Sequence, residues 1–259
     1  PEHGGVARRH LRRTRLDLPC HVPEPSEGLE EAPATLALLL HRRRHGAHRG
    51  VEARGLLEDG GKGAHGGLGG PPVMLEDGGL GLPIDRRFLN HGGEWLRLSA
   101  TGHVLSKQRM QHEQPKQQPA VVALDEQRAL AVLRGYGPAA EGSMMMTRDG
   151  GRLWLTDSAA SLPNPDNPVA LVRLSSGRLL LAGNPQQGKE ALQLWLSADE
   201  GKTWALKRTV EAAADGGAEF TWPTLLLARD GRVHLAYTSR RQTIKHALFS
   251  EAWLDGGAP

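Results

Sequence analysis

The sequence has few aromatic residues, and its first third has none. All six tryptophans, two tyrosines and three phenylalanines lie at or after Phe88. Residues 1–87 instead hold seven of the twelve histidines and sixteen of the thirty-three glycines. Such a segment buries too little apolar surface to offset the entropy of ordering its chain. We therefore predict no blade or other packed sheet within residues 1–87. Two interpretations stay open: a disordered low-complexity extension, or an out-of-frame stretch of a GC-rich gene.

Cysteine, net charge and long apolar runs are also scarce. Cys20 is the single cysteine, so the chain can form neither an internal disulfide nor a cysteine metal cluster. The net charge of +3 is small, and acidic and basic residues are interleaved, which gives no case for nucleic-acid binding. The apolar run at 34–40 is too short to span a membrane and does not resemble a signal peptide. The compartment stays unknown, and the first residue, Pro1, indicates an incomplete N-terminus.

What the chain does contain is a turn motif in two copies, with the pattern Ser/Thr-x-Asp-x-Gly-x-x-Trp. The first copy spans residues 147–154 and includes Asp149 and Trp154; the second spans 197–204 and includes Asp199 and Trp204. An Asp that opens a tight turn accepts bonds from the next backbone amides, and the Gly takes the positive φ. We expect both aspartates to have a structural role on an outer rim, away from any pocket.

A second pattern repeats beside these turns. Residues 121–132, 171–182 and 225–236 each read as an apolar run, a polar turn and another apolar run. The runs are short and not strictly alternating, which is typical of strands buried on both faces. A hairpin followed by an Asp turn gives about four strands per repeat, and four-stranded units at this period are the blades of a β-propeller. The sequence therefore predicts an all-β fold whose blades occupy residues 88–259.

The turn motif resembles the Asp box, or bacterial neuraminidase repeat, of the sialidase superfamily. Residues 118–134, 162–167, 217–223 and 237–246 are similar to the predicted-neuraminidase branch of that superfamily. The resemblance covers about residues 88–250. It implies a six-bladed β-propeller of sialidase type with about four blades present, after an irregular N-terminal segment. It also implies a glycosidase that acts on a terminal, carboxylate-bearing sugar and needs no metal or other cofactor.

Site residues are implied by the same resemblance. Sialidases bind the sugar carboxylate with arginines and use a tyrosine nucleophile activated by a glutamate. Arg134 and one of Arg240 and Arg241 follow predicted inner strands, and planar guanidinium groups suit a carboxylate. Glu219 is the candidate catalytic base. We expect these side chains to converge on one concave site.

Loop asparagines and missing groups complete the prediction. Asn164 and Asn184 follow predicted strands and are candidates to bind the sugar. Phe220 and Trp222 stand where the family has its tyrosine, and no general acid is recognisable in residues 1–87. We therefore expect impaired hydrolysis. A non-catalytic propeller that binds glycan or protein partners, and a frameshifted gene product, stay open as alternatives.

Overall fold

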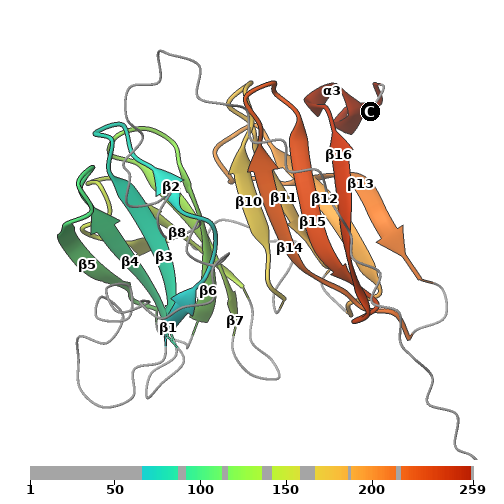
Figure 1. Ribbon diagram of the computed structural model, residues 1–259, viewed down its shortest axis with the longest axis horizontal. Helices are drawn as coiled ribbons and strands as arrows, with labels where there is room; N and C mark the ends of the chain where they lie inside the picture. The colour runs from blue at the N-terminus through green and yellow to red at the C-terminus, as the bar shows by residue number, and fades with distance from the viewer. Residues whose placement is uncertain are drawn as a thin grey trace, which may run out of the picture.

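The structure, a computed structural model, describes residues 66–86, 92–112, 116–135, 142–157, 167–185, 188–213 and 217–257. These residues form sixteen strands in four antiparallel sheets, together with one short helix (Figure 1). Among them, no helix has the length and apolar character that a membrane crossing requires. Candidate residue Asn164 lies outside the described residues.

Each sheet is one blade, and in three of the four sheets the strands follow one another in chain order. Blade A contains β1 (Gly66–Leu68), β2 (Val73–Met74), β3 (Leu80–Arg86), β4 (Gly92–Leu98) and β5 (Val104–Met110). Blade B contains β6 (Lys116–Ala123), β7 (Ala129–Gly135), β8 (Ser143–Thr147) and β9 (Leu155–Thr156). Blade C contains β10 (Ala170–Arg173), β11 (Leu179–Gly183), β12 (Ala191–Ser197) and β13 (Ala205–Ala212). Blade D contains β14 (Phe220–Leu227), β15 (Val233–Ser239) and β16 (Thr243–Phe249), and helix α3 (Glu251–Leu254) follows it.

Three apolar cores hold consecutive blades together face to face. One core joins Trp95 of blade A to Leu133 of blade B, a second joins Leu130 of blade B to Leu181 of blade C, and a third joins blades C and D. The second strand of blade B is buried on both faces, because its residues 129–133 are all at most 8% exposed. The prediction of doubly buried strands is confirmed, and the stacked sheets are arranged as four blades of a β-propeller.

The hairpin repeat has one hydrogen bond in common in all four blades. The backbone amides of Leu75, Leu124, Leu174 and Ala228 each donate to the carbonyl oxygen four residues later, at 2.8–2.9 Å. The strand that follows this turn begins at residue 80, 129, 179 or 233 and is second in the sheet order of each blade. In blade A this second strand is β3, with which both β1 and β2 pair. The repeat predicted from three hairpins therefore has a fourth copy, in blade A.

Blade A corrects the boundary expected at residue 88. Strand β3 pairs with β4 along its whole length, from Leu80 opposite Leu98 to Arg86 opposite Gly92. Strands β1 to β3 lie in the segment expected to hold no blade, so that expectation is wrong for residues 66–86. The physical reason is that an aromatic cover comes from the next strand: a Cβ atom on Gly81 would lie 2.0 Å from the indole of Trp95. Residues 1–65 lie outside the described residues.

The strand directions define two faces of the propeller. Ala129, where β7 begins, pairs with Thr147, and Leu133 near its end pairs with Ser143. The hairpin at 124–128 and the Asp turn after β8 therefore share one face, which we call the turn face. The second strand of each blade ends on the opposite face of the propeller, which we call the strand-end face. An ion pair of 2.7 Å between Arg128 Nη1 and Glu200 Oε2 joins the turns of blades B and C on the turn face.

Candidate functional site

The two Asp turns have the geometry that their motif predicts. In the first, Asp149 Oδ1 accepts from the amides of Arg152 and Leu153 at 2.9 and 3.0 Å, and Gly151 has φ +86°. In the second, Asp199 accepts from the amide and the hydroxyl of Thr203 at 2.9 and 2.6 Å. These two bonds lower the pKa of Asp199 to about 2. Both aspartates stabilise turns on the outer part of a blade.

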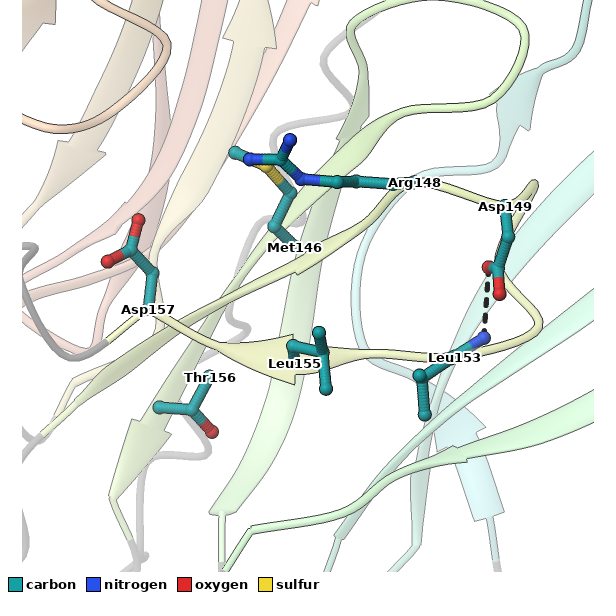
Figure 2. A pocket seen from close by; sticks show the side chains of 7 residues that line it. All are labelled: Met146, Arg148, Asp149, Leu153, Leu155, Thr156 and Asp157. Atoms are coloured by element: carbon teal, nitrogen blue, oxygen red, sulfur yellow. Dashed lines mark hydrogen bonds between the residues drawn. The ribbon is translucent and has the colours of Figure 1, made fainter.

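Asp149 also lines a shallow hollow of about 350 Å³, so the expectation that it lies away from any pocket is wrong. Figure 2 shows Arg148 and Asp157 on one side of the hollow and the Asp149–Leu153 hydrogen bond on the other. The hollow exists because β9 is only two residues long and covers little of β8. It lies on the turn-bearing outer edge of blade B.

Equivalent positions near the ends of the second strands hold polar side chains. If the first residue of each second strand is counted as one, the sixth is Asp85 in blade A, Arg134 in blade B, Asn184 in blade C and Thr238 in blade D. Asp85 Oδ1 accepts from the amide of Gln118 at 3.0 Å, and Asn184 Nδ2 donates to the carbonyl oxygen of Phe220 at 2.7 Å. Each of these bonds crosses to the first strand of the next blade. The fully buried Asn184 therefore holds β14 in place.

Arg134 lies on the strand-end face, as predicted, one residue before the end of β7. Its neighbour across the ladder is Gln117; with the side-chain amide of Gln117 turned so that its oxygen faces the guanidinium group, this oxygen accepts from Arg134 Nη2 at 2.6 Å and from Nε at 3.3 Å. This contact fixes the plane of the guanidinium group, since both donors lie on one edge of it.

Glu219 and Arg241 are brought together on the strand-end face of blade D. The Glu219 carboxylate accepts from Arg241 Nε and Nη2 at 2.7 and 2.8 Å. The Glu219 side chain is 29% exposed and the Arg241 side chain is 73% exposed. Arg134, in contrast, lies two blades away and has Gln117 as a partner. Glu219 thus meets Arg241, one of the two consecutive arginines, as expected. That Arg134 converges on the same site stays a prediction.

The two arginines after β15 are held in a conformation that is unfavourable for them. Arg240 and Arg241 have φ values of +54° and +56°, and the amide of Gln242 donates to Ser239 O at 3.0 Å. Such two-residue hairpin turns favour Asn-Gly, and a left-handed residue other than glycine costs about 1–3 kcal/mol. The amide of Arg240 donates to Glu219 O at 2.7 Å, which helps to hold the turn.

Trp222 is a candidate site residue that the sequence reasoning did not select. It is 54% exposed, has φ +56° and precedes Pro223 in a register shift of β14. Gln118 occupies the equivalent place in blade B, with φ +53° before Pro119. The proline that follows each of these two residues is visible in the sequence. The sequence does not indicate that the residue before it has a positive φ.

Three buried polar atoms near the strand-end face have no hydrogen-bond partner. These are Gln118 Oε1, Ser143 Oγ and Asn184 Oδ1. Ser143 pairs with Leu133, directly beside Arg134 in the ladder. Buried polar atoms are nearly always paired, so each of these three is a place where a water could bind; Arg97 Nε and the indole nitrogens of Trp154 and Trp204 are unpaired in the same way elsewhere in the blades.

The tyrosine that the structure describes is buried and bonded to a carboxylate. Tyr237 is 5% exposed, and its hydroxyl donates to Glu211 Oε1 at 2.6 Å. Burial, and then the Glu211 carboxylate, raise the pKa of Tyr237 above its ordinary value. Lys245 shares the same carboxylate oxygen. The three side chains clamp β13 of blade C to blade D.

A match to a known family covers most of the blades. The BNR repeat-like domain matches residues 56–235, which is more than half of the chain. The chain belongs to this family. The match begins before residue 66 and agrees with the correction made for blade A. Among curated proteins, none is significantly similar in sequence.

Solved structures show the same propeller at low sequence identity. A protein of unknown function from Dyadobacter fermentans is 16% identical with a TM-score of 0.57, over 73% of this chain and 65% of that one. The intramolecular trans-sialidase from Ruminococcus gnavus, in complex with oseltamivir carboxylate, is 14% identical with a TM-score of 0.52, over 74% and 46%. The Trypanosoma rangeli sialidase, in complex with the inhibitor DANA, is 12% identical with a TM-score of 0.54, over 71% and 31%. The alignments thus cover between about a third and two thirds of the length of these three proteins. At such low sequence identity the similarity shows a shared fold.

Proposed function

We propose that the strand-end face binds a terminal acidic sugar and that its parent activity is exo-sialidase-type glycoside hydrolysis. The observation that carries the proposal is the Arg240–Arg241 turn, held in a strained conformation beside Glu219. Arg241 uses Nε and Nη2 on Glu219, which leaves three of its five N–H donors for a ligand. A sugar carboxylate is an anion that a planar guanidinium group pairs with well.

Further groups on this face support a sugar ligand. Trp222 follows Thr221, which pairs with Thr238, two residues before Arg240. Its exposed indole offers an apolar surface for the less polar face of a sugar ring. Arg134 adds a second oriented guanidinium group in blade B. The solved sialidase with DANA and the trans-sialidase with oseltamivir carboxylate bind their ligands on the same type of propeller.

A non-catalytic glycan-binding propeller is the second candidate, and one observation favours it. Phe220 is 1% exposed and has no hydroxyl, Trp222 stands at the expected tyrosine position, and Tyr237 is buried with a raised pKa. Phe220 and Trp222 have no hydroxyl to act as a nucleophile, and the hydroxyl of Tyr237 is buried against Glu211. We therefore expect acidic-sugar binding with slow turnover or none.

Calorimetric titration of the purified chain with N-acetylneuraminic acid and with neutral methyl galactoside tests the binding part. We expect binding of the acidic sugar alone, weakened in Arg134→Ala and in Arg241→Ala. The matched control is Arg232→Ala, since Arg232 is also an exposed arginine bonded to a carboxylate, Asp230, but lies on the turn face of the same blade. Unchanged binding in both site variants would refute the proposed site.

A fluorogenic sialoside separates the two candidates. Turnover at roughly 1 s⁻¹ or faster, typical of enzymes, would establish the hydrolase and reject the non-catalytic alternative. Binding of the acidic sugar without turnover would establish the glycan-binding propeller.

A further inference from the structure

Blade D carries a pair of histidines that the proposed sugar site does not use. His234 of β15 and His246 of β16 lie with His234 Nδ1 and His246 Nε2 3.0 Å apart. Their ring centroids are 5.1 Å apart, and the ring planes are inclined by 33°. At this distance one ring nitrogen donates its N–H to the lone pair of the other, so the two rings share one proton.

The strand register explains why both rings lie on the same side of the sheet. Buried and partly exposed residues alternate along β15, with His234, Ala236 and Thr238 on the more exposed side. His246 pairs with Ala236, so the two histidines are diagonal neighbours on this side. The opposite side of β15 carries Leu235 and the core shared with blade C.

We propose that His234 and His246 form a binding site for a divalent late first-row metal ion such as Cu²⁺, Ni²⁺ or Zn²⁺. Metal–imidazole bonds of about 2.1 Å at a right angle place the two nitrogens about 3.0 Å apart, whereas a tetrahedral angle places them about 3.4 Å apart. The observed 3.0 Å is also the length of an ordinary N–H···N hydrogen bond, so it brings the two nitrogens within reach of one ion without selecting a coordination geometry. The ion would replace the shared proton after each ring has turned to aim its lone pair at the metal, because the 5.1 Å between centroids leaves the rings nearly end to end.

The surroundings leave the other coordination positions to water. Among the described residues, no group of three or more His, Cys, Asp or Glu side chains is placed to hold a metal. Leu226 and Leu248 flank His234 on the neighbouring strands and are 61% and 38% exposed. Asp230, the carboxylate nearest to His234 in the sequence, lies in the turn before β15 and is bonded to Arg232. The ion would therefore be held by two protein ligands.

The position of the pair gives the site a role in stability. Within the described part of the chain, blade D has three strands where the other blades have four or five, and β16 pairs with β15 alone. An ion bound to one histidine from each strand adds a cross-strand link at this weakly held edge. A ligand that binds only the native state stabilises it by mass action. The site is independent of the sugar site on the strand-end face.

Hydrogen exchange of the full chain, measured with and without Ni²⁺, tests the proposal. In the wild type we expect Ni²⁺ to slow exchange of the β15 and β16 amides, and His234→Ala or His246→Ala should abolish this effect. His103→Ala is the matched control, because His103 is an exposed histidine in blade A whose Nδ1 is bonded to Thr101. Histidines of residues 1–65 are shared by all variants and do not contribute to the difference.

A calorimetric Ni²⁺ titration gives a second measure that does not depend on β16 dynamics. Loss of either histidine should weaken one binding step by at least about tenfold, since even loss of a supporting residue costs 10–100-fold. If His246→Ala is too unstable to purify, His246→Gln replaces it in the titration. Slowed exchange that persists in both histidine variants, or exchange that Ni²⁺ does not change in the wild type, would overturn the proposal.

Discussion

Asp199→Ala is the perturbation whose magnitude follows most directly from the structure. The change removes the bonds that the carboxylate accepts from the Thr203 amide, the Thr203 hydroxyl and Ser197 Oγ. Water can replace part of this bonding, because the Thr203 donors are exposed. We therefore expect the free energy of unfolding to fall by about 1–2 kcal/mol at neutral pH, less than three full bonds would give.

The pH dependence of this loss has a definite sign. Bonds from Thr203 depress the folded-state pKa of Asp199 from 3.8 to about 2. Stability from a depressed carboxylate is fully present above its unfolded value and is lost as the pH falls through the folded value. The difference between wild type and Asp199→Ala should therefore narrow as the pH falls from 3.8 towards 2.

Urea unfolding followed by tryptophan fluorescence measures both effects. Thr203→Val is the matched variant: it removes the hydroxyl bond but keeps the amide bond, so it should cost about half as much. An unfolding free energy unchanged by Asp199→Ala, or a loss that stays constant down to pH 2, would refute the structural role of this carboxylate.

Three further predictions concern blade A, the arginine turn and the buried tyrosine. Gly81→Ala should lower the urea midpoint by the equivalent of about 1–3 kcal/mol, because its Cβ would overlap the Trp95 ring; an unchanged midpoint would contradict the pairing of β3 with β4. Arg240→Gly should raise the free energy of unfolding by up to about 1 kcal/mol through relief of the positive φ, while calorimetry should show weaker acidic-sugar binding. Tyr237→Phe should cost about 1 kcal/mol of stability through loss of its bond to Glu211, and a sialoside assay should give the same rate as the wild type. A rate abolished by Tyr237→Phe would show that this tyrosine has a chemical role.

The sequence predicted those parts of the fold that depend on neighbouring residues. The Asp turns close through bonds between residues at most four positions apart, and the hairpin turns close through one bond that spans four residues. Their residue types are therefore visible in any single copy, and their repetition indicates the propeller. Arg134 was placed at a strand end by the same local reasoning.

The boundary at residue 88 failed because it relied on the composition of one segment. The apolar cover of β3 is supplied by Trp95, a residue of the following strand. A count of aromatic residues within the segment cannot detect a neighbour that arrives through pairing.

By itself, the sequence determined the repeated turns, the doubly buried strands and the family to which the chain belongs. Tertiary structure alone decided which polar groups meet across the chain. Asn184 bonds to Phe220, Glu211 to Tyr237, Glu219 to Arg241 and His234 to His246, over separations of 36, 26, 22 and 12 residues. The physical reason is that these contacts depend on strand register and on how blades stack, and both are set by the packing of apolar cores rather than by the polar residues themselves.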